Sequence, residues 1–253
     1  MSEKSPTFLR SLALVATLVG ATQAAPTVKT VELKGHHEAR DLDYEVSYPQ
    51  LEGLADAAVQ EKVNAKLRLM GLAGKRLMEI HLRTWKKPEG WDLSSYVSVG
   101  FTVEALTPEL LSVSQSISDY YAGTAHPNGT LRARTFDLKT GEVVSRRLFS
   151  EGALDEVARR VDQKLRADPE NKLDGEHLLD TPTAEDIRQV AVAKDGLVFL
   201  FDAYTLGSYA QGPAVTKLSF QELDGLLNQE LLGPVISRAA GAAATPGVVG
   251  SLR

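Results

Sequence analysis

Cysteine is absent from all 253 positions of the sequence. This absence excludes a disulfide scaffold, a thiolate metal site, a cysteine nucleophile and a lipid anchor on cysteine. The chain also lacks an apolar run of the roughly 20 residues that a membrane-spanning helix needs. Hydrophobic residues make up 43% of the chain, which is normal for a protein with a core.

Sequence signatures of catalysis are missing as well. No Gly-x-Ser-x-Gly elbow occurs, so nothing supports a serine hydrolase. His36 and His37 are adjacent, and neighbouring side chains on a strand point to opposite faces, so they would not chelate one ion together. We therefore expect no metal, no cofactor and no enzyme. The alternative is a cell-envelope hydrolase whose site would gather His126, Asp119 and Tyr121 around a perturbed carboxylate.

The N-terminus has the pattern of a cleaved signal peptide. Lys4 and Arg10 flank a polar start, positions 11–21 form a short apolar run, and small residues precede a cut after Ala24. We expect residues 1–24 to be removed and the protein to be secreted or periplasmic, with no membrane span after cleavage. An uncleaved anchor is the rival interpretation, but its apolar run would be too short.

The strongest structural pattern is a β-meander. Larger residues alternate with serines over positions 111–118, as in a strand with one apolar face. Positions 122–129 hold two glycines, Pro127 and an Asn-Gly pair, which favour a chain reversal. A second strand over 131–138 returns, and a tight turn leads to a third over 142–145.

The remaining apolar patterns predict further strands and three helices. Period-2 alternation or short apolar runs predict strands over 27–33, 42–48, 96–103, 189–193, 197–201 and 214–218. We expect Pro49 to stop the second of these strands. Helical spacing of apolar residues predicts helices near 54–82, 151–166 and 220–232.

Three local signals refine the helices. Gly71 and Gly74 predict a bend or break in the first helix, and Ser150 predicts a cap for the second. Ser219 and Glu222 form a capping box that would open the third. We predict an α+β fold, a single compact domain over 25–237 with an antiparallel sheet and helices packed against it.

Within that domain, the pattern divides into a first segment over about 27–106 and a second over about 107–232. Beyond position 238 the chain is mostly Ala, Gly, Val and Pro, so 238–253 is expected to be a disordered tail.

Aromatic residues in or beside predicted loops are the candidate binding residues. Aromatic side chains at such places either cover the edge of a core or anchor a partner. Covering the core is the default, and a binding face becomes the better interpretation if several are exposed on one side. For His126 the simpler interpretation is a ring that bonds turn carbonyls. The candidates are Trp91, Tyr120, Tyr121, His126, Tyr204 and Tyr209.

Four stretches in this order resemble a known family: YEVSYPQLEGLADAAVQEKVN from Tyr44, LLSVSQSISDYYAGTAHPNGTLRARTFDLKTGEVV from Leu110, LF ending at Phe149, and DGLVFLFDAYTLGSYAQGPAVTKLSFQEL from Asp195. The chain resembles the extracytoplasmic domain of RsiV-type, lysozyme-binding anti-sigma factors and the related N-terminal module of peptidoglycan deacetylases. Other members are secreted domains of unknown function. We expect the module alone, without a sigma-binding segment or a deacetylase domain.

The resemblance implies a non-catalytic binding protein whose partner is lysozyme, another cell-envelope protein or peptidoglycan. The net charge of −5 becomes more negative by one when residues 1–24 leave, because Glu3 goes with Lys4 and Arg10. An acidic protein outside the cytoplasm is not expected to bind nucleic acid.

Overall fold

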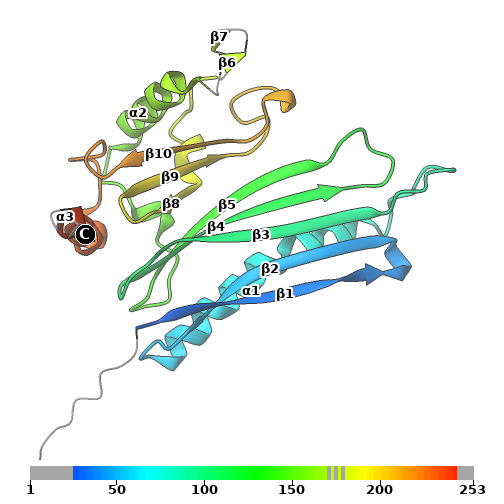
Figure 1. Ribbon diagram of the computed structural model, residues 1–253, viewed down its shortest axis with the longest axis horizontal. Helices are drawn as coiled ribbons and strands as arrows, with labels where there is room; N and C mark the ends of the chain where they lie inside the picture. The colour runs from blue at the N-terminus through cyan, green and yellow to red at the C-terminus, as the bar shows by residue number, and fades with distance from the viewer. Residues whose placement is uncertain (1–24, 170–171, 174–175, 178–179, 244–253) are drawn as a thin grey trace, which may run out of the picture.

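The structure, a computed structural model, describes residues 25–169, 172–173, 176–177 and 180–243. The predicted signal peptide, residues 1–24, lies outside the described residues. Figure 1 shows a five-stranded sheet with one long helix against it and, beside it, a smaller sheet with two further helices. The predicted α+β fold is confirmed, with the strands divided between two main sheets.

The larger sheet has the order β1-β2-β3-β4-β5, and every neighbouring pair is antiparallel except β2 and β3. The chain leaves β2, runs through the long helix α1 and returns into β3, and such a crossover makes the two strands parallel. An antiparallel sheet was therefore the wrong prediction for this one pair. The bounds are β1 Thr27–His37, β2 Leu42–Glu52, α1 Ala57–His81, β3 Ser95–Leu106, β4 Leu110–Tyr120 and β5 Asn128–Asp137.

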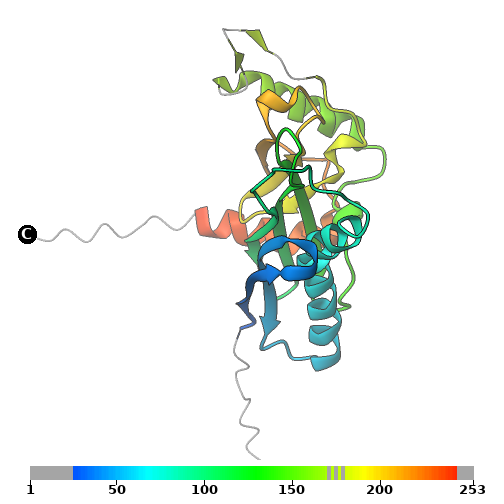
Figure 2. The ribbon, with the colours of Figure 1, turned by 90° about the vertical axis from the view of Figure 1, so that its right-hand side faces the viewer.

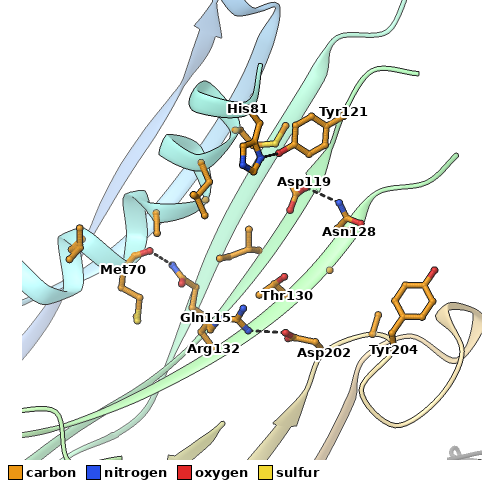
Figure 3. A pocket seen from close by; sticks show the side chains of 18 of the residues that line it. Met70, His81, Gln115, Asp119, Tyr121, Asn128, Thr130, Arg132, Asp202 and Tyr204 are labelled. Atoms are coloured by element: carbon orange, nitrogen blue, oxygen red, sulfur yellow. Dashed lines mark hydrogen bonds and ion pairs between the residues drawn. The ribbon is translucent and has the colours of Figure 1, made fainter. Parts of the chain in front are cut away.

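The predicted hairpin is present as β4 and β5. Its register places Gln115 opposite Arg132, Ile117 opposite Thr130 and Asp119 opposite Asn128. These six side chains lie on the face of the sheet that also carries α1 (Figure 3). The predicted third strand of the meander is absent, because Val143 makes only a single bridge to Phe136 before a 3-10 turn begins.

Helix α1 is one continuous helix, so the predicted break at Gly71 or Gly74 is wrong. Both glycines are buried against the sheet, and Gly71 leaves no room for a larger side chain. A Cβ atom on Gly71 would lie 2.4 Å from Cβ of Tyr48, and one on Gly74 would lie 3.1 Å from Cγ2 of Ile117. The helix begins after Asp56, whose carboxylate accepts hydrogen bonds from the second and third amides of the helix.

Strand β5 is an edge of the larger sheet, and side chains from later segments satisfy its outward backbone amides. Asp202 accepts from the amide of Leu131, Gln189 from that of Ala133, and Ser145 from that of Thr135. A sheet edge with free backbone amides can pair with a strand of another chain. The three side-chain oxygens occupy these amides and so block such pairing. They also tie the second half of the chain to the first.

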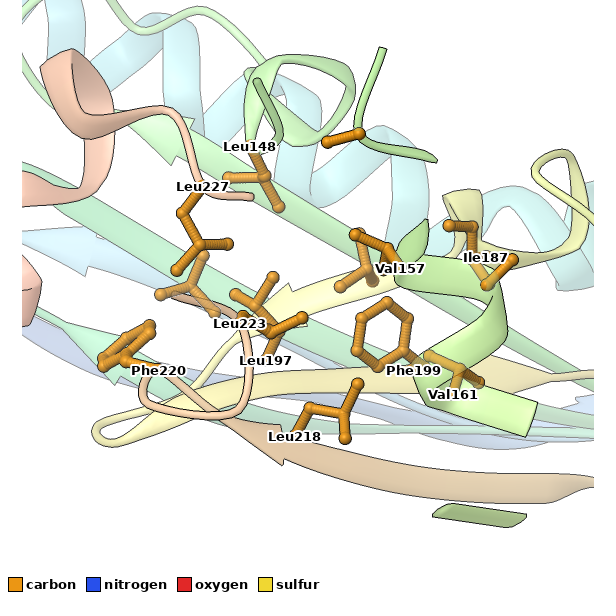
Figure 4. Close-up of a cluster of buried hydrophobic side chains, with 14 of the residues drawn as sticks. Leu148, Val157, Val161, Ile187, Leu197, Phe199, Leu218, Phe220, Leu223 and Leu227 are labelled. Atoms are coloured by element: carbon orange, nitrogen blue, oxygen red, sulfur yellow. The ribbon is translucent and has the colours of Figure 1, made fainter. Parts of the chain in front are cut away.

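The smaller sheet has the order β10-β9-β8 and lies over the main hydrophobic core (Figure 4). Phe199 and Phe201 of the central strand β9 are buried between the sheet and the helices α2 and α3, as the apolar run over 197–201 predicts. In Figure 2 α2 lies at the top of the molecule and α3 projects to the left, while α1 lies at the lower right. The bounds are α2 Leu154–Ala167, β8 Val190–Val192, β9 Gly196–Phe201, β10 Ala214–Ser219 and α3 Gln229–Ala243, with a short β6–β7 hairpin at Lys172–Leu173 and Glu176–His177.

The C-terminal part differs from the prediction. The capping box forms, since the amide and hydroxyl of Ser219 donate to Glu222 and the amide of Glu222 donates to the Ser219 hydroxyl. It opens a series of turns over 220–226, however, in which Gly225 adopts a φ of 76°, and no helix follows directly. The helix predicted over 220–232 begins only at Gln229 and continues to Ala243, so the predicted tail does not start at 238; residues 244–253 lie outside the described residues.

Two other local predictions are also wrong. Pro49 lies inside β2, at a point where β2 pairs with β1 alone because its pairing with β3 ends at Val46. A missing amide is tolerated at such a half-open position. Ser150 does not cap α2, because its hydroxyl donates to the carbonyl of Leu227. No helix of the described residues is long and apolar enough to cross a membrane.

Candidate functional site

A groove of about 1110 Å³ lies between α1 and the hairpin of β4 and β5 (Figure 3). Helix α1 forms one wall, the exposed face of the two strands forms the floor, and the segment from Asp202 to Tyr209 forms the opposite wall. We call it the α1–β5 groove. Its helical wall runs from Lys66 to His81, which is about 22 Å along a helix axis.

The groove exists because α1 covers only part of the sheet. The close approach of Gly71 to Tyr48 and of Gly74 to the valines of β3 places the helix over β2 and β3. The neighbouring hairpin keeps its face toward α1 partly open at Ile117 and Thr130. Gln115 is almost fully buried beneath the middle of α1, and its side-chain amide donates to the backbone carbonyl of Met70 at 3.2 Å.

The helical wall of the groove is apolar. Leu69 and Leu77 are 60% and 55% exposed, and Ala73 lies between them at the same four-residue spacing. Residues four apart share one face of a helix, so these three form a second apolar stripe beside the buried one that faces the sheet. Exposed apolar stripes of this kind are typical of contact surfaces.

Two arginines stand on the floor of the groove with different partners. Arg132 donates to Asp202 at 2.8 Å, in an ion pair that joins β5 to the end of β9. Arg134 is half-buried and donates to the carbonyl of Ala133 at 2.7 Å. Burial lowers the pKa of Arg134, and the neighbouring charges of Arg132 and Arg146 lower it further. An arginine remains protonated at neutral pH, so this is a positive charge held in an unfavourable environment.

Lys66 marks the same end of the groove, but its charge is neutralised. Its Nζ atom lies 2.8 Å from Glu142 and 2.8 Å from the carbonyl of Gly141. Hydrogen bonds from Lys62 and Lys66 lower the pKa of Glu142 to about 2. This turn beyond β5 is therefore bound to the start of α1 by two ammonium groups.

The other end of the groove is aromatic. Trp85 packs against Tyr121 with ring centroids 5.5 Å apart, and its indole N–H donates to the carbonyl of Ala122. The Tyr121 hydroxyl lies 2.7 Å from Nδ1 of His81. Burial raises the pKa of Tyr121, and the charge of Asp119 raises it further, so the phenol is neutral at physiological pH.

A second aromatic group faces the first across the floor. His126 stacks on Tyr209 at 3.8 Å, and the Tyr209 hydroxyl donates to the carbonyl of Pro127 at 2.7 Å. Tyr204 lies 5.6 Å from Tyr209 and is 63% exposed. Its φ of 70° is in the left-handed region, which costs a non-glycine residue about 1 kcal/mol or more. Strain of this kind concentrates at binding and active sites.

The structure brings most of the predicted binding residues to one place. Tyr121, Tyr204 and Tyr209 line the groove, and His126 reaches it through its stack on Tyr209. The carbonyl of Pro127 accepts from Nδ1 of His126 at 3.0 Å, which agrees with the simpler interpretation of that histidine. Two candidates lie elsewhere: Tyr120 is buried beside the ring of Tyr96, and Trp91 is exposed outside the groove.

The helical wall and the two arginines were not among the residues predicted from the sequence. The signal for the wall was the second apolar stripe of α1, Leu69-x3-Ala73-x3-Leu77, which an amphipathic surface helix does not need. Arg132 and Arg134 alternate with buried residues on a strand, a signal that places them on one face without showing what that face meets.

The described part of the chain holds no cluster of three His, Cys, Asp or Glu side chains that could bind a metal ion. The polar groups of the groove are bonded mainly in separate pairs. The carboxylate of Asp119 accepts a hydrogen bond from the side-chain amide of Asn128 at 3.0 Å, and the hydroxyl of Tyr121 is hydrogen-bonded to the ring of His81. His126, Asp119 and Tyr121 thus gather around the same end of the groove, but each is bonded to a different neighbour.

Comparisons with known proteins identify the fold. Residues 146–221 match the model of a family described as "Protein of unknown function (DUF3298)". The crystal structure of a DUF3298 family member from Bacteroides fragilis is 16% identical, with a TM-score of 0.66, over 87% of this chain and 99% of that chain. A DUF3298 family protein from Pseudomonas aeruginosa is 15% identical, with a TM-score of 0.56, over 83% and 97%. No curated protein matches the chain.

The matched segment runs from the 3-10 turn after β5 to the turns after β10, so it includes one wall of the groove and not α1, β4 or β5. The two crystal structures cover nearly all of the described fold. At these identities they show a shared fold. The chain therefore has the fold of DUF3298 proteins and carries a match to that family's model in its second half.

Proposed function

We propose that the protein is a non-catalytic binding protein that acts outside the cytoplasm, after removal of residues 1–24, and holds its ligand in the α1–β5 groove. The observation that carries this proposal is the groove itself. It is as large as the sites that take drug-sized or larger ligands, and it combines an apolar wall with a few polar and aromatic groups. That composition is typical of recognition sites.

The bonding of the polar side chains supports a binding role over a hydrolytic one. A general base must reach the proton that it abstracts, and a nucleophile needs a base within hydrogen-bond distance. Here His126 donates to a turn carbonyl, Asp119 is bound to Asn128, and the Tyr121 phenol is neutral. The contact that joins a hydroxyl to a possible base is that of Tyr121 with His81 at 2.7 Å, and among the described residues no carboxylate bonds the His81 ring to orient it as a base.

Two ligand classes follow from the resemblance to RsiV-type domains and deacetylase modules. One is cell-wall material, which the aromatic and polar groups of the groove suit. The other is lysozyme, a basic protein that the acidic net charge of this chain would attract through long-range electrostatics. The arginines of the groove do not complement a basic protein, so lysozyme would bind mainly elsewhere on the surface.

The test is a pull-down of the purified protein with lysozyme and with isolated peptidoglycan at low and moderate salt. Binding to peptidoglycan that survives moderate salt is the expected result. Retention of lysozyme that weakens as salt rises would indicate the electrostatic partner. Release of soluble wall fragments during the incubation would contradict the non-catalytic role, and retention of neither partner would refute the proposed function.

A further inference from the structure

We propose that the α1–β5 groove recognises an acidic glycopeptide in two parts, with sugar rings between its aromatic groups and a carboxylate at Arg134. This inference rests on the function proposed above and specifies the chemistry of the ligand. The two parts lie along β5, from Thr130 to Arg134, about 13 Å apart by the rise of a strand. The groove is open along this length.

Arg134 provides the anion-binding part. Among the described residues no carboxylate lies within ion-pair distance of its guanidinium, whereas the neighbouring Arg132 is paired with Asp202. A half-buried charge without a counter-ion is unfavourable, and a ligand carboxylate would relieve that cost with charge-assisted, bidentate hydrogen bonds. The chain as a whole is acidic, so most of its surface repels an anion. The positive charge of Arg134 therefore favours binding of an anionic ligand in the groove over binding elsewhere.

The aromatic end provides the sugar-binding part. Trp85 and Tyr204 are 41% and 63% exposed, and each is supported by a second ring, Tyr121 or Tyr209. Trp85 is fixed by the bond of its indole N–H to the carbonyl of Ala122, and Tyr204 is held by its ring contact with Tyr209. Their exposed apolar faces suit the C–H faces of sugar rings. The strained backbone at Tyr204 holds one of these rings beside the groove.

Polar groups for hydroxyl and acetamido groups lie between the two aromatic groups. Asn128 uses one amide hydrogen on Asp119, so its carbonyl, its second hydrogen and the remaining carboxylate lone pairs are available. Thr130 adds a hydroxyl on the same face. Figure 3 shows Asp119 and Asn128 between Tyr121 and Tyr204, with Thr130 further along the floor toward Arg132.

This composition favours a glycopeptide over a lipid chain. An acyl chain needs a continuous apolar lining, but the floor of the groove carries Gln115, Thr130 and Arg132 along its length. Gln115 and Arg132 are bonded within the protein. Hydrocarbon over the Thr130 hydroxyl and the Arg134 guanidinium, however, would exclude water without supplying hydrogen bonds, which is unfavourable. A glycan with an acid-bearing peptide satisfies the polar floor, the rings and the arginine together.

The experiment is a calorimetric titration of the full chain with three soluble probes: a disaccharide tetrapeptide from peptidoglycan, the tetrapeptide alone, and an oligomer of N-acetylglucosamine. We expect the disaccharide tetrapeptide to bind most tightly. Arg134→Gln should weaken its binding about tenfold or more, the loss expected for a charge-assisted bond, and leave the uncharged oligomer unaffected. Tyr204→Ala should weaken both sugar-containing probes.

Matched controls are Arg76→Gln and Trp91→Ala, which change an exposed arginine and an exposed tryptophan outside the groove. Arg134→Lys retains the charge and should recover part of the affinity. The inference is overturned if the tetrapeptide alone binds as tightly as the glycopeptide, or if the groove variants match wild type. It is also overturned if intact peptidoglycan or lysozyme binds and the soluble glycopeptide does not; in that case the proposed function stands.

Discussion

Replacing Gly71 by alanine tests the contact that places α1 on the sheet and so shapes the groove. The new Cβ would lie 2.4 Å from Cβ and 2.6 Å from Cγ of Tyr48. The nearer of these atoms is attached directly to the backbone of β2, so a change of side-chain rotamer cannot remove the clash. The helix or the strand must move.

The direction of the effect follows from two opposing contributions to the free energy of unfolding. Alanine in the interior of a helix is favoured over glycine by about 1 kcal/mol. Overpacking a tight core costs about 1–3 kcal/mol, and a displaced backbone belongs at the upper end of that range. Gly71→Ala should therefore destabilise the protein by about 2 kcal/mol, although the same change in most helices is stabilising.

Gly74→Ala is the matched control. Its Cβ would lie 3.1 Å from Cγ2 of Ile117, a methyl group that can shift slightly, so the change should be close to neutral. Urea denaturation followed by circular dichroism measures both variants. A Gly71→Ala protein as stable as wild type would refute the proposed packing of α1 on Tyr48.

Two further predictions concern stability. Ser112→Ala should lower the free energy of unfolding by about 1–3 kcal/mol, because the buried hydroxyl accepts a hydrogen bond from the backbone amide of Val192 at 2.8 Å. Ser114→Ala, at a half-buried site, should lower it by less in the same denaturation assay. Hydrogen bonds from Lys164 and then from the capping box lower the pKa of Glu222 to about 2, so its stabilising contribution is complete above the ordinary value of 4.5 and is lost as the pH falls through 2. Glu222→Gln should therefore be less stable than wild type near pH 7, and the difference in the free energy of unfolding should shrink as the pH falls from 4.5 toward 2. A difference that is the same at pH 7 and at pH 2 would contradict this.

The sequence predicted elements best where the pattern was local. Alternation over 111–118 and the turn residues after it led to the hairpin of β4 and β5, and helical spacing led to most of α1. Gly71 was misread because a glycine that weakens an isolated helix is here required by the closeness of Tyr48. Ser219 and Glu222 form their predicted bonds, but a capping box does not determine whether a helix follows.

The candidate site was only partly predictable, because three distant segments build it. The loop aromatics Tyr121, Tyr204 and Tyr209 were candidates from the sequence, yet nothing in it showed that Leu77 would face them across a groove. Arg134 matters because it lacks a carboxylate partner among the described residues, and pairing is a tertiary property. The fold had to be known before the site could be assembled.

The most direct test of the groove as the binding site uses the absence of cysteine. Leu77→Cys would place a single thiol in the groove, and Leu93→Cys would place one at a similarly exposed site outside it; the two leucines are 55% and 62% exposed. The measurement is the rate of thiol alkylation with and without peptidoglycan fragments. The account predicts that the fragments slow the reaction at position 77 and leave position 93 unchanged. Equal rates at position 77 with and without saturating fragments would contradict it.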